Sequence, residues 1–282
     1  MPLVHITIAN KPHPGLDALR LSTTRHTVQT RVLGMGSKTA IGHGGNGFGL
    51  KLELLHQELK LLPLDTVVLF TDAFDVLIQD SEDAIVAWVQ AHPTQVLFAA
   101  EKTKWPCKEL MYPIPLHLPY AYLNSGVFAG TSQAILGLLD AAPYTNLTDD
   151  QEYYTRLFLG GAPIVLDHRA EYFQCLQGVD KSSLVFDTVG QKVHVHHDDG
   201  VAPWSTTPTV LHLNNGGTRL KLFSACIGTV LGPAYTYLSR QIMVSIILDF
   251  LSYNSPTIFK VLGLVLCVAL VRNIRVGARL VH

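Results

Sequence analysis

Short apolar runs alternate with segments of helical spacing along most of the chain. An apolar run without charges is typical of a strand buried on both faces, whereas apolar residues three and four positions apart are typical of an amphipathic helix. The runs predict strands at Val4–Ala9, Thr27–Leu33, Thr66–Thr71, Val96–Ala100, Tyr122–Gly130, Ile164–Asp167 and Thr209–Leu213. Helical spacing predicts helices at Leu50–Leu62, Ser81–Ala91, Ser132–Ala141 and Asp149–Leu159. Strands that alternate with helices predict an α/β fold with a mostly parallel sheet flanked by helices.

Local signals refine this outline. Ser81 and Thr148 each precede an acidic first turn, which predicts that they are helix N-caps. Gly34–Gly49 is a glycine-rich loop and Pro106–Pro119 a proline-rich one. Weak alternation over Ser183–His196 predicts a hairpin.

The pattern changes near the C-terminus, so we divide the chain into a catalytic-type domain, 1–222, and an apolar helical tail, 223–282. Two apolar stretches, Ile242–Leu251 and Val261–Val271, lie in this tail, and three arginines follow the second. Neither stretch reaches the roughly 20 residues of a spanning helix, although the arginines fit the cytoplasmic flank of a membrane segment. Membrane contact through 242–271 and a pair of packing helices are therefore both open interpretations.

Composition excludes some classes of protein. The 282 residues are 48% hydrophobic and carry a net charge of −1, which argues against a nucleic-acid partner. The four cysteines are far apart and show neither metal spacing nor a disulfide framework. The first residues lack the basic and apolar regions of a signal peptide, so we expect none. The compartment stays open, with membrane association in the secretory pathway as one option.

The strand Thr66–Thr71 carries the most informative chemistry, because Asp72 and Asp75 follow it directly. Open α/β sheets bind ligands at the carboxyl ends of their strands. Two nearby carboxylates can hold Mg²⁺ or Mn²⁺ against a diphosphate and stabilise its departure from a sugar. This pattern favours a nucleotide-sugar transferase, whereas the structural alternative is that Asp72 caps a turn and Asp75 is solvated.

His212 ends a second apolar run and precedes Asn214 and a glycine pair. A neutral imidazole can complete a mixed oxygen and nitrogen shell for Mn²⁺, and glycines let the backbone approach a phosphate. A histidine at this position is otherwise a core or strand-end residue.

Four further residues are candidates on weaker grounds. Asp149 and Asp150 open a helix, where at least one serves the helix dipole and the other can orient or deprotonate an acceptor hydroxyl. Trp105 and Asn124 lie near loop or strand ends, where an aromatic plane can pack on a sugar and an amide can fix hydroxyl geometry. For both of these residues a structural role is the alternative.

Two tempting motifs are set aside. The run His194–Asp199 is interpreted as a strand end entering a solvated turn rather than as a metal site. The stretch Gly34–Thr39 is not a phosphate-binding loop, because Ser37 and Val32 stand where that motif requires glycine.

Five motifs in one order resemble the glycosyltransferase domain of the multifunctional procollagen lysyl hydroxylases, over about Val4 to Leu222. They are Phe70-Thr-Asp-Ala-Phe-Asp-Val76, Tyr122-Leu-Asn-Ser-Gly126, Asp149-Asp-Gln-Glu-Tyr-Tyr-Thr-Arg156, Leu166-Asp-His-Arg169 with Phe173-Gln174, and His212-Leu-Asn214. The chain is too short to include the hydroxylase domains, so the resemblance implies sugar transfer alone.

The resemblance implies a GT-A fold, Mn²⁺ and a UDP-sugar. It implies that the metal ligands are Asp72, Asp75 and His212. It places at the nucleotide Thr7, Lys51, Phe74 and Asn214, with the Phe74 ring stacked on uracil. It places at the donor sugar and acceptor side Trp105, Asn124, Asp149 and Asp150.

The chain departs from the family pattern in three places. The acidic run is shortened to Asp149 and Asp150, Val127 replaces the second glycine of Asn-Ser-Gly-Gly, and Met35–Gly49 lacks a tryptophan. Our leading hypothesis is a Mn²⁺-dependent, or Mg²⁺-dependent, hexosyltransferase. It would use UDP-glucose or UDP-galactose, with an acceptor that is hydroxylysine or galactosyl-hydroxylysine in collagen-like sequences, or another glycan. The alternatives are a non-catalytic, membrane-attached nucleotide-sugar-binding module and a metal-dependent phosphohydrolase.

Overall fold

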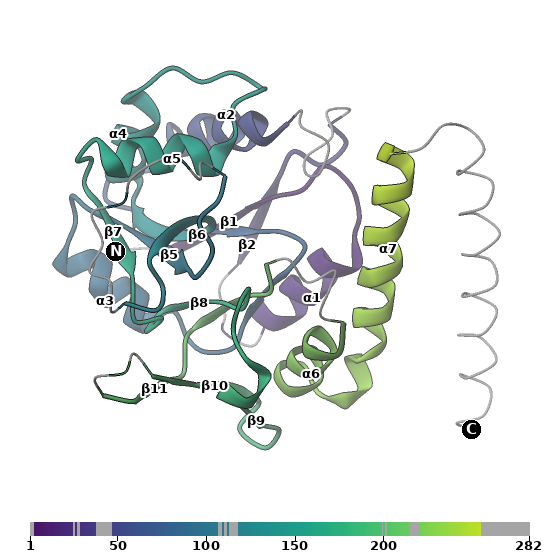
Figure 1. The fold of residues 1–282 in the computed structure, drawn as a ribbon. Coiled ribbons are helices and arrows are strands. Elements are labelled where there is room, and N and C mark those ends of the chain that lie inside the picture. Colours follow the sequence, from purple (N-terminus) through teal and green to yellow (C-terminus); the bar gives the residue numbers. More distant parts are fainter. Residues whose placement is uncertain are drawn as a thin grey trace.

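A six-stranded sheet in the order β2–β1–β3–β6–β5–β7 forms the centre of the molecule (Figure 1). This computed structural model describes residues 3–254 except 25, 27–28, 38–46, 107–108, 110–111, 113–117, 199, 201 and 215–219. The strands are β1 (Leu3–Ile8), β2 (Thr30–Leu33), β3 (Val67–Asp72), β5 (Val96–Glu101), β6 (Tyr122–Thr131) and β7 (Ile164–Asp167). All run in one direction except β6, which is antiparallel to both of its neighbours. The predicted mostly parallel sheet with flanking helices is confirmed.

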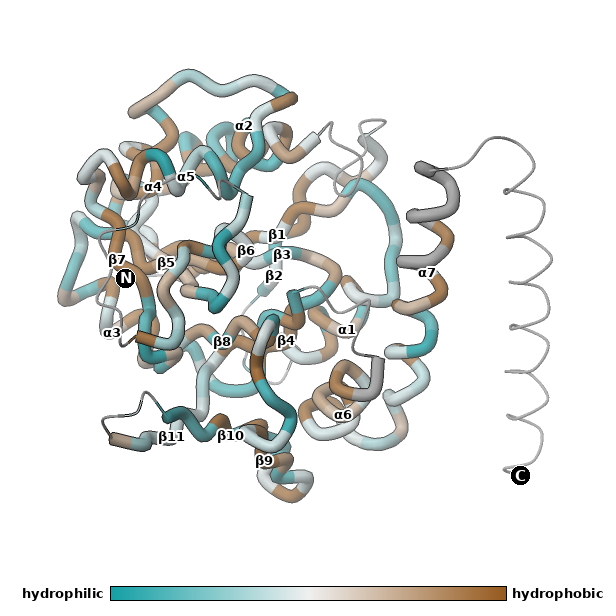
Figure 2. Tube along the Cα trace, in the orientation of Figure 1, coloured by the Kyte–Doolittle hydropathy of each residue, from teal (hydrophilic) through white to brown (hydrophobic). Residues whose placement is uncertain are grey.

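Alternate residues of the central strands bury against different helices. One set, including Phe70, Phe98 and Phe128, packs against α2 (Phe48–Leu59), α4 (Ser132–Asp140) and α5 (Asp150–Leu159). The other set, including Leu69 and Leu97, packs against α1 (Pro14–Thr23) and α3 (Asp83–Ala91). The apolar runs read from the sequence are therefore strands covered on both faces, and Figure 2 shows how hydrophobic β5 and β7 are.

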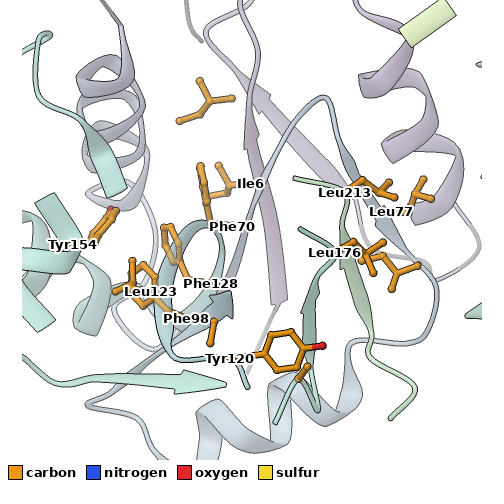
Figure 3. Close-up of a cluster of buried hydrophobic side chains, with 14 of the residues drawn as sticks. Ile6, Phe70, Leu77, Phe98, Tyr120, Leu123, Phe128, Tyr154, Leu176 and Leu213 are labelled. Carbon is orange, nitrogen blue, oxygen red and sulfur yellow. The ribbon is translucent and has the colours of Figure 1, made fainter. Parts of the chain in front are cut away.

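Aromatic rings fill the core beneath α5. The ring centroid of Phe128 lies 4.7 Å from those of both Phe70 and Phe98 and 5.4 Å from that of Tyr154 (Figure 3). These distances are in the range that favours aromatic pairs beyond their apolar area. This ring cluster fixes α5, and with it Asp150, against the sheet.

A small second sheet, β4–β12–β8, lies beside the end of β3. Its strands are β4 (Val76–Ile78), β8 (Phe173–Cys175) and β12 (Val210–His212). Strand β12 is antiparallel to β4 and parallel to β8, so His212 pairs with Val76 on one side and with Cys175 on the other. The main-chain N–H of Leu213 also donates to the carbonyl of Asp75 at 2.7 Å. A segment from the end of the domain is thereby held next to the turn that follows β3.

The third sheet consists of β9 (Leu184–Asp187), β10 (Lys192–His197) and β11 (Trp204–Thr206). Strands β9 and β10 pair antiparallel, which confirms the predicted hairpin. The histidines of β10 bond to hydroxyls of its surroundings, with His194 Nδ1 2.7 Å from Thr207 Oγ1 and His196 Nδ1 2.6 Å from Ser205 Oγ.

Three short strands and one helix escaped prediction. Strands β4, β8 and β11 have three residues each, too few to display a period of two. Helix α1 begins with Pro14 and Gly15, residues typical of turns, but proline suits the first helical turn. The Nδ1 atom of His13 caps this helix by accepting from the Gly15 N–H at 3.0 Å.

Both predicted N-caps are wrong by one residue. The caps are Glu82 for α3 and Asp149 for α5. The hydroxyl of Ser81 donates to Asp83, and that of Thr148 accepts from the main-chain N–H of Thr145. The Ser81 hydroxyl therefore bonds to a side chain of the first helical turn, and the Thr148 hydroxyl to the turn before its helix.

Beyond residue 219 the described chain forms α6 (Leu220–Val230), a short 3₁₀ turn (Pro233–Tyr235) and α7 (Tyr237–Asn254), and a second 3₁₀ turn lies earlier, at Lys181–Ser183. Cys226 and Ile227 of α6 are fully buried, and α7 packs against α1 and α6 (Figure 1).

The predicted apolar stretch Ile242–Leu251 lies within α7, whereas Val261–Val271 lies outside the described residues. Among the helices that the structure describes, none combines the length and the hydropathy of a membrane span. Membrane contact through 242–271 and the division of the chain at 222/223 stay predictions.

We expect Phe128→Ala to lower the free energy of unfolding by about 3–5 kcal/mol, because it removes the ring at the centre of the aromatic cluster. Val189→Ala is the control, since its side chain is 95% exposed, and it should change stability by less than about 0.5 kcal/mol. Urea denaturation followed by circular dichroism measures both. A loss below about 1 kcal/mol for Phe128→Ala would contradict the assigned packing.

Candidate active site

Three ligand-type side chains converge where β3 ends. Asp72 is the last residue of β3, Asp75 precedes β4, and His212 ends β12, which pairs with β4. The His212 Nε2 atom lies 3.8 Å from Asp72 Oδ2 and 3.6 Å from Asp75 Oδ2. The three ligand atoms lie within 4.8 Å of one another, and the described residues hold no other such group of three or more. Two carboxylate oxygens and one imidazole nitrogen form a donor set that suits Mn²⁺ or Mg²⁺.

Gly126 leaves the space that this triad occupies. A Cβ atom at position 126 would lie 2.3 Å from His212 Cε1 and 2.7 Å from Asp72 Oδ2, closer than real contacts allow. The pairing of β5 with β6 also shifts here, since Phe98 pairs with Phe128 but Ala99 pairs with Asn124. Such irregularities re-aim residues beside active sites, and this one turns residues 124–126 toward the triad.

His212 and Asp75 stabilise each other's charged forms. Burial raises the pKa of Asp75, but the charge and hydrogen bond of His212, together with the charges of Lys51 and His13, outweigh burial and hold the pKa below its usual range. Burial likewise would lower the pKa of His212, but Asp75 raises it well above the ordinary value. The pair is therefore held together by charge as well as by strand pairing.

Lys51 connects the triad to α5. Its Nζ atom lies 2.8 Å from Asp72 Oδ1 and 2.7 Å from Asp150 Oδ2, and the residue is only 8% exposed. Burial would lower the pKa of Lys51, but the two carboxylates outweigh burial and keep the pKa above its usual value. The structure thus places Lys51 between two predicted site residues.

The neighbouring aspartates Asp149 and Asp150 have separate environments. Asp149 is the N-cap of α5 and accepts from the Glu152 N–H at 2.9 Å. Asp150 is buried, and its Oδ2 atom accepts from Ser125 Oγ at 3.1 Å as well as from Lys51. Asp149 therefore caps the helix, and Asp150 is the one of the two that contacts Lys51; a role of either at the acceptor stays a prediction.

Asn124 and Asn214, both predicted site residues, meet at a carboxylate that the sequence analysis missed. Glu101 ends β5 and accepts from the side-chain amides of Asn124 at 3.1 Å, Gln151 at 2.8 Å and Asn214 at 2.9 Å. Burial raises the pKa of Glu101, and its amide partners offset part of this rise. The signal was available, because Glu101 follows the apolar run Val96–Ala100 in the way that Asp72 follows its own run. Nothing in the sequence marks Gln151.

Trp105 lies on the chain that leaves β5. Its side chain is 56% exposed, and its carbonyl accepts from Gln151 Nε2 at 3.0 Å. The exposed ring is therefore tied to the Glu101 network through its own backbone.

Thr7 and Phe74 are held by contacts with β3 and with His13. The Thr7 hydroxyl is fully buried and donates to the Thr71 carbonyl at 2.8 Å, so its side chain joins β1 to β3. Phe74 sits between the two aspartates in sequence, and its ring centroid lies 4.2 Å from that of His13, another residue that sequence analysis missed. For both, contact with a nucleotide stays a prediction.

Comparisons with known proteins agree with the resemblance read from the sequence. A family model described as the PLOD GT domain matches residues 1–236. A procollagen-lysine,2-oxoglutarate 5-dioxygenase of Drosophila melanogaster is 31% identical over 77% of the chain, and a multifunctional procollagen lysine hydroxylase and glycosyltransferase of Rattus norvegicus is 29% identical over 78%. The chain spans 31% and 30% of these curated relatives' lengths.

Among solved structures, a glycosyltransferase involved in the glycosylation of the major capsid of PBCV-1 superposes with a TM-score of 0.45 and 11% identity. The superposition covers 76% of this chain and 94% of that one.

We expect Gly126→Ala to weaken Mn²⁺ affinity about 10- to 100-fold, because the added methyl displaces His212 and Asp72. Isothermal titration calorimetry with Mn²⁺ measures this change. Gly137→Ala in α4 is the matched control, since its Cβ would meet no atom within 4 Å. Equal Mn²⁺ affinity in Gly126→Ala and wild type would show that the triad does not hold the ion.

Proposed function

We propose that this chain, which belongs to the PLOD GT domain family of glycosyltransferase domains, transfers a hexose from a UDP-sugar to a hydroxyl acceptor with the help of Mn²⁺. The observation that carries this proposal is the convergence of Asp72, Asp75 and His212, with ligand atoms within 4.8 Å, at the end of a buried strand. Mg²⁺ is the alternative ion, because the same oxygens suit it.

The three residues would hold the ion at the diphosphate of the donor. A bound divalent ion neutralises the diphosphate and stabilises its departure from the sugar. Lys51 keeps the Asp72 carboxylate in place and offsets the repulsion between Asp72 and Asp150, to which it is bonded at 2.8 and 2.7 Å. The absence of a side chain at Gly126 leaves the space that these groups occupy.

Asp150 is our choice for the residue that orients the acceptor hydroxyl. Its carboxylate is fixed by both Lys51 and Ser125, so it presents an acceptor in a defined position. We assign Trp105 to the sugar, because its exposed ring is tethered to the same network through Gln151. Asp149, Asn124, Asn214, Phe74 and Thr7 complete the proposed surroundings of donor and acceptor.

The donor we propose is UDP-glucose or UDP-galactose, and the acceptor is hydroxylysine or galactosyl-hydroxylysine in a collagen-like sequence. The names of the relatives, which refer to procollagen lysine, support the choice of acceptor. Mass spectrometry of products formed from several UDP-sugars and a hydroxylysine-containing collagen-like peptide would identify both substrates.

We expect the double variant Asp72→Ala/Asp75→Ala to lose Mn²⁺-dependent turnover of UDP-hexose by at least about 100-fold, because two of three metal ligands are removed. The assay measures UDP release with and without Mn²⁺. Asp65→Asn, an exposed carboxylate near the start of β3, is the control and should behave as wild type.

Three outcomes would count against transfer. Equal and low turnover in the wild type and the double variant would reject the proposal. Tight binding of UDP and Mn²⁺ with no transfer to any acceptor would favour the non-catalytic binding module. Release of inorganic phosphate from simple phosphoesters would favour the phosphohydrolase.

A further inference from the structure

Glu101 is a buried carboxylate to which the proposed reaction gives no role. The residue is 2% exposed and accepts three side-chain amide hydrogen bonds. Asn124 and Gln151 donate to its Oε1 atom, and Asn214 donates to its Oε2 atom. These donors come from β6, from α5 and from the residues after β12, so Glu101 ties three elements of the site together.

The contacts of Glu101 fix the orientation of the Asn124 amide. An ionised carboxylate only accepts hydrogen bonds, so Asn124 must turn its Nδ2 atom toward Glu101. The contact of the amide oxygen supports the same orientation, because the main-chain N–H of Gly126 donates to Asn124 Oδ1 at 3.0 Å. The amide oxygen therefore faces away from Glu101.

That oxygen faces His212. Asn124 Oδ1 lies 3.0 Å from His212 Nδ1, and because an amide oxygen only accepts, Nδ1 must carry the hydrogen. The charged imidazole carries a hydrogen on both nitrogens; if a metal ion displaces the Nε2 hydrogen, the one on Nδ1 stays and the Nε2 lone pair faces the ion. Nε2 is the nitrogen that lies 3.8 and 3.6 Å from the carboxylate oxygens of Asp72 and Asp75.

We propose that Glu101 is a positioning residue, which acts through Asn124 to keep the His212 hydrogen on Nδ1 and the lone pair on Nε2, toward the divalent cation. This inference rests on the proposed cation site at Asp72, Asp75 and His212. Partners that orient a metal-ligating histidine typically contribute about 10- to 100-fold to metal affinity. It also gives Asn124 a contact with His212 in addition to its proposed place near the donor sugar.

The experiment is a double-mutant cycle in which Mn²⁺ binding is titrated by electron paramagnetic resonance of the free ion, without any sugar nucleotide. Glu101→Gln keeps the shape of the side chain but replaces one carboxylate oxygen by an NH₂ group. At least one of the three amide N–H groups that bond to Glu101 then faces another donor instead of an acceptor. We expect Glu101→Gln and Asn124→Ala each to weaken Mn²⁺ binding about 10-fold. The double variant should bind Mn²⁺ as Asn124→Ala does, because the link is already cut.

Glu82→Gln is the matched control, since Glu82 is 3% exposed and lies at the start of α3; it should bind Mn²⁺ as wild type does. Additive losses in the double variant, or unchanged affinity in Glu101→Gln, would overturn the inference. If Glu101→Gln does not fold, Asn124→Ala decides alone, because wild-type affinity in that variant has the same meaning.

The failure of this inference can be told apart from failure of the proposed function. A wild-type chain that does not bind Mn²⁺ would remove the basis of both. If the wild-type chain binds Mn²⁺ and Glu101→Gln binds it equally well, only the role of Glu101 is disproved. The proposed sugar transfer is then still tested by its own assay.

Discussion

The pairing of β12 with β4 is the constraint on which the site depends. Asp75 and His212 are far apart in the sequence, yet the register that sets His212 opposite Val76 also places it beside Asp75. The hydrogen bond from Leu213 N–H to the Asp75 carbonyl closes the same pair of strands. Because the pleat repeats every two residues, a slip of one residue would turn the imidazole to the other face. The apolar partners Val210 and Leu211, both fully buried, make such a slip costly.

Charge balance is the second constraint. Asp72, Asp75 and Asp150 gather near one another, and like charges at close range repel strongly in a partly buried site. Lys51 bridges two of these carboxylates and His212 pairs with the third, so each of the three carboxylates has a cationic partner. A divalent cation would add positive charge to a site that already holds its ligands in position. The conformational entropy of these side chains is therefore lost when the chain folds and not when the cation binds.

Much of the fold and part of the site followed from the sequence. The long buried strands were found because four or five consecutive apolar residues leave a clear signal, and Asp72 was found because a charge follows such a run. The contact between Asp72 and His212 could not be derived from spacing, since it depends on a three-residue strand, β12, whose partners are equally short. Only the family resemblance predicted that Asp72 and His212 lie together. Glu101 was missed although it ends β5 as Asp72 ends β3, because a single acid suggests no ligand pair.

Two of the departures from the family pattern fall where the structure can accommodate them. The chain has Asn-Ser-Gly-Val instead of Asn-Ser-Gly-Gly, and the glycine that must clear His212 and Asp72 is Gly126, which is retained. Val127 is fully buried in the apolar cluster that contains Leu69 and Leu97, where a larger side chain adds packing. Loss of the second glycine therefore leaves the ligand atoms unobstructed. The shortened acidic run can be explained in the same way. Asp149 caps α5 and Asp150 forms an ion pair with Lys51, so the two residues present make both of the interactions that the structure shows for this run.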